Sequence, residues 1–197
     1  MNRIALLLFI SAATSSVVLA QNKVSRPVAV LVMSGGTGPS WELPARPRIV
    51  GRPNSTTVNI PSGASILSAE LRAFALINRK RVEAGLNPLT WSSRLEGVAR
   101  SHSTDMARRA YFDHRSPSGK KVADRADDAS LGEWKAIGEN IAVNRGYPDP
   151  IARAVEGWVI SPLHKSNLLA RNWTESAVGV AIAADGSYYF TQVFLRR

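Results

Sequence analysis

Three short polar signatures, which follow one another between residues 111 and 169, constrain this chain more strongly than its composition does. Their boundaries are Tyr111–Pro117, Gly138–Ala142 and Ser161–Leu169. Each signature places one titratable side chain among apolar or turn-forming residues, and these are His114, Glu139 and His164. Two imidazoles and a carboxylate that share a cleft could bind a divalent metal or exchange protons. These three residues therefore form the candidate site.

The N-terminal residues have the pattern of a secretory signal. Arg3 supplies a positive start, Ile4–Ile10 is an apolar run, and small or aliphatic residues lead up to Ala20. The alternative is an uncleaved membrane anchor, but the uninterrupted apolar run is too short to favour one. We expect residues 1–20 to be a cleaved signal peptide and no transmembrane span to follow it.

A segment rich in proline and glycine comes next and predicts a linker over residues 21–65. It contains one apolar run, Val28–Met33, which could dock as an edge strand or as a bound peptide. The rest of the segment does not predict regular structure. The folded domain is expected to occupy residues 66–197.

The chain contains no cysteine, and this excludes several kinds of chemistry. Disulfides, a thiolate nucleophile, cysteine-ligated metals and lipoprotein acylation are all ruled out. Hydrophobic residues make up 45% of the chain and charged residues 20%, so a packed core is expected. Export without cysteines fits a bacterial secreted or periplasmic protein better than a eukaryotic secreted one.

The net charge favours contact with anionic surfaces. It is +10 for the whole chain, and because Arg3 is the only charge in residues 1–20, the remainder carries +9. Phospholipid head groups and anionic wall polymers are candidate partners, although such a charge can also serve only solubility. The basic residues are scattered and show no aromatic–basic repeat, so nucleic acid is not expected as a partner.

Apolar residues at helical spacing predict two long helices at the start of the domain. The first covers residues 68–84, capped by Ser68 and ended by Gly85, and its apolar face is Leu71, Phe74, Ala75, Leu76 or Ile77, and Val82. The second covers residues 92–110, and its apolar face is Leu95, Val98, Ala99, His102, Met106 and Ala110. A short basic helix is expected over residues 120–128.

The second half of the chain predicts one more helix and a small sheet. Asp149 followed by Pro150 is a strong helix start, and the apolar face that follows is Ile151, Ala154, Val155, Trp158 and Val159. Residues 134–143 are expected to form a short strand and turn. Two alternating segments around Asp185-Gly186 predict a C-terminal hairpin. The fold class is therefore α+β, with a small antiparallel sheet flanked by helices.

The order and wording of the three signatures, together with Leu86–Trp91, resemble the CAP family in its cysteine-free bacterial form. This family groups the cysteine-rich secretory proteins, antigen 5 and the pathogenesis-related 1 proteins. The resemblance covers residues 66–197 and implies an α-β-α sandwich. It also implies that His114 and His164 are candidate ligands of Zn²⁺ or another divalent cation, with Glu139 orienting water or a ligand imidazole.

Several residues have two interpretations. Many family members have an acid where this chain has Ser161, which weakens a proton-transfer role. The three site residues could instead form a hydrogen-bonded cluster that only braces loops. His102 fits a core histidine satisfied by a hydrogen bond, or else a third metal ligand. Glu139 should pair with a cation or donor, or have a raised pKa.

Other side chains are candidates for lesser roles. Asn140 is expected to tie loop backbone through its amide, and Asp105 to pair with Arg109 one turn away. Trp134 and Tyr147 are the candidates for contact with an apolar ligand. Asn140 and Ser161 complete the candidate ligand-binding set.

The sequence leaves three competing functions. The favoured one is a monomeric, non-enzymatic, secreted or periplasmic module that binds a lipid, a cell-envelope component or another extracellular ligand. The alternative is a metal-assisted hydrolase, peptidase- or nuclease-like, that uses His114, His164 and Glu139. The third is a structural envelope protein held by its basic N-terminal segment. No serine lies in a nucleophile-elbow context, so a Ser-His-Asp triad is not supported.

Overall fold

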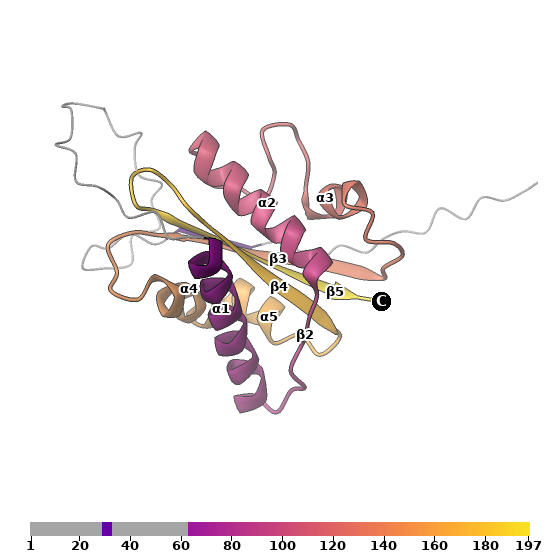
Figure 1. Cartoon of the computed structure of the whole chain (residues 1–197). Helices are drawn as coiled ribbons and strands as arrows, with labels where there is room; N and C mark the ends of the chain where they lie inside the picture. Colours follow the sequence, from indigo (N-terminus) through magenta and orange to yellow (C-terminus); the bar gives the residue numbers. More distant parts are fainter. Residues whose placement is uncertain (1–28, 33–62) are drawn as a thin grey trace, which may run out of the picture.

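The computed structural model describes residues 29–32 and 63–197, which form five helices and five strands. The strands make one sheet in the order β1-β3-β5-β4-β2 (Figure 1). Their bounds are Ala29–Val32 for β1, Thr90–Trp91 for β2, Ala136–Asn144 for β3, Glu175–Ile182 for β4 and Tyr188–Arg196 for β5. The expected signal peptide and most of the expected linker lie outside the described residues.

The sequence predicted an antiparallel sheet, but the sheet is mixed. Its three central strands pair antiparallel, whereas the edge strands β1 and β2 pair parallel with β3 and β4. Within the predicted apolar run, Ala29–Val32 forms an edge strand, one of the two options that the sequence left open. The two parallel pairings were not predicted, because each involves a very short strand whose partner is distant in the sequence.

Helices cover both faces of the sheet, which confirms the α-β-α sandwich (Figure 1). The helices α1, α4 and α5 lie on one face; their bounds are Gly63–Glu83, Pro150–Ile160 and Pro162–Leu168. The helices α2 and α3 lie on the other; their bounds are Ser93–Arg109 and Val122–Asp128. Each layer has its own apolar core, with Trp158 and Phe190 in the first and Leu95 and Leu195 in the second.

Helix α2 packs directly on β4 because Gly179 has no side chain. A Cβ atom at this position would overlap the backbone of Ala99 and Arg100. Ser103 fastens the same contact, since its hydroxyl donates to the Gly179 carbonyl at 3.0 Å. The predicted buried face of α2 is confirmed except for Ala110, which is exposed and ends the helix in the left-handed region at φ +51°.

Helix α1 differs most from its prediction. It begins at Gly63 and not at a Ser68 cap, and Leu71 and Val82 are exposed. Its buried face includes two charged residues in their place, Glu70 and Arg81. Glu70 accepts hydrogen bonds from the Arg100 guanidinium and from the Val180 backbone N–H, so its carboxylate joins α1 to α2 and β4. Hydrophobic periodicity misses such a face because it assigns charged residues to the surface, whereas both of these side chains are hydrogen-bonded inside the fold.

The segment predicted as a short strand and turn is the long strand β3. It has a neighbour on both sides and is buried along almost its whole length. Its polar residues suggested a turn, but the buried carboxylate and amide at Glu139 and Asn140 are hydrogen-bonded within the fold. The C-terminal hairpin is confirmed, and Gly186 adopts the φ of +83° that its tight turn requires.

Helix α4 starts at the predicted cap. The Asp149 carboxylate accepts a hydrogen bond from the Ala152 backbone N–H at 3.0 Å, and Pro150 occupies the first turn. Asp149 also pairs with Arg72 of α1, and that hydrogen bond is the main reason why the pKa of Asp149 lies below its ordinary value.

We expect Asp149→Ala to lower the free energy of unfolding by about 1 kcal/mol, because it removes the cap. Asp149→Asn keeps a capping oxygen and loses only an exposed ion pair, so it should stay within about 0.5 kcal/mol of wild type. Urea denaturation of both variants measures the difference. Equal losses would show that the ion pair, and not the cap, holds α4.

Candidate functional site

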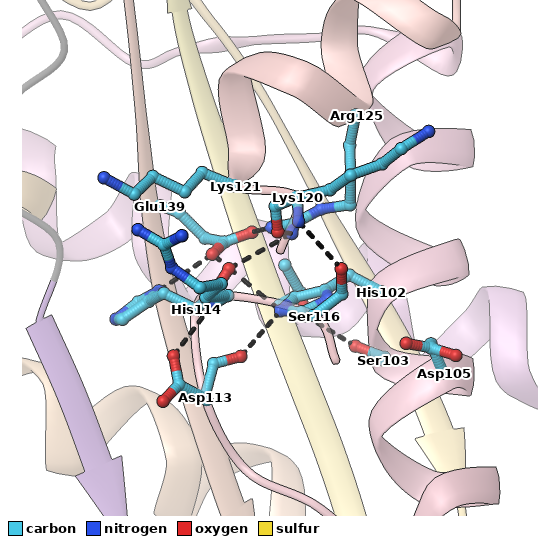
Figure 2. Close-up of polar contacts among 12 residues, drawn as sticks. His102, Ser103, Asp105, Asp113, His114, Ser116, Lys120, Lys121, Arg125 and Glu139 are labelled. Carbon is cyan, nitrogen blue, oxygen red and sulfur yellow. Dashed lines mark hydrogen bonds and ion pairs between the residues drawn. The ribbon is translucent and has the colours of Figure 1, made fainter. Parts of the chain in front are cut away.

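Glu139 of β3 is the centre of a buried polar cluster between the sheet and the α2–α3 layer (Figure 2). Its Oε1 accepts a hydrogen bond from His114 Nδ1 at 2.8 Å, and its Oε2 accepts one from Arg125 Nη2 at 2.5 Å. The carboxylate is fully buried. Of the two options that the sequence left open for Glu139, the structure shows pairing.

Arg125 holds the loop that carries His114. Besides its contact with Glu139, its Nη1 donates to the carbonyls of His114 at 3.1 Å and Lys120 at 3.0 Å. Helix α3 therefore presents one guanidinium to the strand and to the loop together. Sequence reasoning missed this residue, because nothing in the basic segment 120–128 distinguishes Arg125 from its charged neighbours.

His102 of α2 is a core histidine satisfied by a hydrogen bond, one of its two predicted roles. It is buried, and its Nε2 donates to the Asp113 carbonyl at 3.0 Å. The same nitrogen lies 4.0 Å from Glu139 Oε1, so the ring lines the cluster. The Tyr111 hydroxyl donates to Asp105 at 2.6 Å, and Asp105 pairs with Arg109 as predicted.

The cluster holds one carboxylate and one guanidinium in close contact. Burial alone would raise the pKa of Glu139, but the hydrogen bond from His114 and the charge of Arg125 outweigh it, so the pKa lies below its usual range. Burial lowers the pKa of His102, which keeps that ring neutral at pH 7. The carboxylate is therefore ionised and already paired, which makes it a weak base.

His164 belongs to the other layer. It lies on α5, where its Nδ1 and the Ser161 hydroxyl form a hydrogen bond of 2.7 Å. Ser161 thus fills the place of the expected acid with a hydrogen bond to the histidine. The backbone carbonyl of His164 accepts from Asn140 Nδ2 at 3.2 Å.

Asn140 lies in β3 and not in a loop, which corrects its predicted setting. Its Oδ1 accepts from Asn167 Nδ2 at 3.1 Å, so its amide ties the strand to α5. Because consecutive strand residues point to opposite faces, Asn140 faces α5 whereas Glu139 faces α2 and α3. The structure thus brings His114 and Glu139 together on one face, and Asn140, Ser161 and His164 together on the other.

The remaining candidates are also placed. Trp134 is 6% exposed and packs in the core under α2 and α3, so it presents little surface to a ligand. Tyr147 is half-buried in the connection from β3 to α4, with the Arg153 guanidinium 5.2 Å from its ring centre. Within the described residues, no three His, Asp or Glu side chains gather in a way that would hold a metal ion.

Comparison with known proteins agrees with this architecture. The model of the CAP, or cysteine-rich secretory protein, family matches residues 74–194. The chain is 34% identical over 141 residues to the uncharacterized protein YkwD of Bacillus subtilis, and 38% identical over 130 residues to the uncharacterized membrane protein YlbC of the same organism. These alignments cover 72% and 66% of this chain but 51% and 35% of the relatives, so the chain spans about half of YkwD and about a third of YlbC.

Solved structures show the same fold. An extracellular SCP-domain protein of Bacillus anthracis superposes with a TM-score of 0.59 at 30% identity, over 70% of this chain and 44% of the other. An outer surface protein of Borrelia burgdorferi gives 0.60 at 20% identity, over 70% of this chain and 97% of the other. In the described part of the present chain, no helix combines the length and apolar character needed to cross a membrane. The match over residues 74–194 places this chain in the CAP family, in a cysteine-free form.

Proposed function

We propose that this protein is an extracellular or periplasmic binding module for a small apolar molecule with one polar end. A pocket between the first turns of α1 and the start of α4, with a volume of about 380 Å³, carries this proposal. Its apolar lining includes Ile66, Ala69, Ile151, Ile182 and Tyr188. Pockets of this size with an apolar lining and a few polar groups suit small ligands.

The pocket also offers a place for a polar end. Arg72 and Asp149 line it as an exposed ion pair, so a ligand carboxylate or head group could exchange with the aspartate. Tyr147, one of the predicted ligand contacts, directly precedes the lining residues Pro148–Pro150 in the sequence. Surface or extracellular descriptions of the structural neighbours support a role outside the cytoplasm. Export through residues 1–20 and a monomeric state belong to the same proposal.

The buried carboxylate supports binding more than hydrolysis. A hydrolase using Glu139 needs that group free to take a proton, but both of its oxygens are engaged and its pKa is lowered. The cluster is better explained as the brace that holds the His114 loop and α3 on the sheet. Proteins that share one fold can have many functions, so the contacts of Glu139 are a better guide to function here than membership of the family.

A bulky side chain in the pocket tests the proposal. We expect Ala69→Trp to weaken binding of dodecanoate, a probe with an apolar chain and one carboxylate, by about tenfold or more, since it fills the lining. Ala75→Trp is the matched control, because Ala75 is exposed on the same helix and does not line the pocket. It should leave the affinity within about twofold. Isothermal calorimetry measures both, and equal affinities in the two variants would contradict the proposal.

Zinc binding by His114 and His164 stays a prediction, and it is tested by an experiment separate from the one on the pocket. Calorimetric titration compares the wild-type protein with the His114→Ala/His164→Ala double variant. Binding heat that disappears in the double variant would establish a cleft metal site and revive the hydrolase alternative. An absence of heat in the wild type would leave both histidines with the hydrogen bonds already described.

A further inference from the structure

A second pocket lies between the turn from α1 to β2 and the connection from α5 to β4. Its volume is about 460 Å³, and it is separate in lining from the α1–α4 pocket and from the Glu139 cluster. Its lining includes two arginines, Arg81 and Arg171, and no aspartate or glutamate. We call it the two-arginine pocket.

Arg81 is a buried cation without a carboxylate partner among the described residues. Its side chain comes from the end of α1 and is 1% exposed. Its Nε donates to the Asn87 carbonyl at 3.1 Å, and its Nη1 donates to the carbonyls of Leu168 at 2.7 Å and Ala170 at 3.0 Å. These carbonyls fix the direction of the guanidinium but do not neutralise its charge. Burial accordingly lowers the pKa of Arg81, with no acidic group opposing the effect.

The guanidinium retains donor capacity toward the pocket. Three of its N–H groups are used by the carbonyls, and among the described residues Nη2 has no hydrogen-bond acceptor. Although Nη2 has no partner there, it is not fully enclosed by protein atoms. We infer that it faces the open space that Arg81 lines. A buried cation with unused N–H donors is unfavourable unless water or an anion accepts hydrogen bonds from those donors.

Arg171 adds a second, adjustable cation at the rim. It is exposed in the connection from α5 to β4, and no carboxylate of the described residues pairs with it. Asn87, Thr90 and Thr174 supply further polar side chains around the opening. One fixed and one adjustable guanidinium around a single pocket match the geometry of an oxyanion.

We propose that the two-arginine pocket binds one oxyanion group, a carboxylate or a phosphate, of an extracellular ligand. Arg81 Nη2 donates from the floor and Arg171 closes over the anion from the rim. This site goes beyond the apolar pocket proposed above and does not depend on it. It gives two of the 25 basic residues of the chain a specific role, in addition to any diffuse attraction to anionic surfaces.

The test is a nuclear magnetic resonance titration of the ¹⁵N-labelled full chain with inorganic phosphate and, separately, with acetate. Ionic strength is held constant with sodium chloride. The Arg81 Nε–H resonance is the reporter, because its hydrogen bond to Asn87 lies beside Nη2. We expect a saturable shift with at least one of the two anions, and the tighter of the two identifies the chemical group.

Two charge-matched variants separate a built site from general surface charge. Arg171→Gln should weaken the binding about tenfold, since it removes one charged hydrogen-bond donor. Arg94→Gln removes an equal charge from an exposed position on α2 that does not line the pocket, and it should leave the affinity within about twofold. Equal weakening by both variants, or no saturable shift with either anion, would overturn the proposal. Neither probe has an apolar chain, so failure here does not bear on dodecanoate binding.

Discussion

Gly179→Ala should lower the free energy of unfolding by about 3 kcal/mol or more, enough to leave much of the protein unfolded at moderate temperature. The added methyl group has no space, because the backbone of α2 at Ala99 and Arg100 occupies its position. Relief requires α2 to move off β4, which would also lengthen the hydrogen bond from Ser103 to the Gly179 carbonyl. Urea denaturation and circular dichroism measure the loss.

Gly97→Ala is the control for this substitution. Gly97 lies within α2, and a Cβ atom there meets nothing within 4 Å apart from its chain neighbours and the backbone of its own helix. The same chemical change should therefore stabilise the protein by about 0.5–1 kcal/mol, because alanine loses less conformational freedom in a helix. If Gly179→Ala were as stable as Gly97→Ala, the close contact of α2 and β4 would be wrong.

The second large effect is expected at the centre of the polar cluster. Glu139→Gln should lower the free energy of unfolding by about 3 kcal/mol, because it leaves the Arg125 guanidinium without its buried counter-charge. Glu133→Gln removes the same charge from an exposed residue three positions before the start of β3, and should change stability by less than about 0.5 kcal/mol. Thermal and urea denaturation at pH 7 compare the two variants.

Acid should reproduce this loss in the wild-type protein. The pKa of Glu139 is lowered in the folded state, so its contribution is complete above the unfolded pKa of about 4.3 and disappears as pH falls through the folded value. Wild type should therefore lose stability more steeply than Glu139→Gln below about pH 5. Parallel pH profiles would show that folding does not lower the pKa of Glu139.

A double variant distinguishes the ion pair from a general packing defect. Adding Arg125→Met to Glu139→Gln removes the stranded cation, so the combined loss should be smaller than the sum of the two single losses. The hydrogen bonds from Arg125 to the carbonyls of His114 and Lys120 disappear as well, so full recovery is not expected. Additive losses would contradict a direct pairing of Glu139 with Arg125.

Local signals in the sequence were enough where the buried side chains are apolar. The buried stripe of α2, the Asp149 cap of α4 and the hairpin around Gly186 followed from spacing and turn chemistry. The same reasoning failed on α1, where Glu70 and Arg81 take core positions and the apolar Leu71 and Val82 face solvent. Periodicity assumes that a charged residue is exposed, but Glu70 accepts a hydrogen bond from Val180 and Arg81 donates one to the Ala170 carbonyl, and both partners lie far along the chain.

The candidate site was predictable in part for the same reason. His114 and Glu139 could be identified because each is a lone titratable group in its signature, and the structure places them in contact. Arg125 could not be identified, since its role depends on how α3 packs against β3. The separation of His164 from Glu139 by the sheet depends on the register of β3, which no local pattern specifies.

The adjacent polar residues Glu139 and Asn140 also favour the correct alignment of β3 against β5 during folding. A slip of one residue against β5 would exchange the directions of Glu139 and Asn140. The carboxylate would then face Asn167 and the backbone of α5, and Arg125 would face an amide with no charge. A misaligned strand is thereby penalised on both faces of the sheet together, which favours a single alignment of β3 in a chain without disulfides.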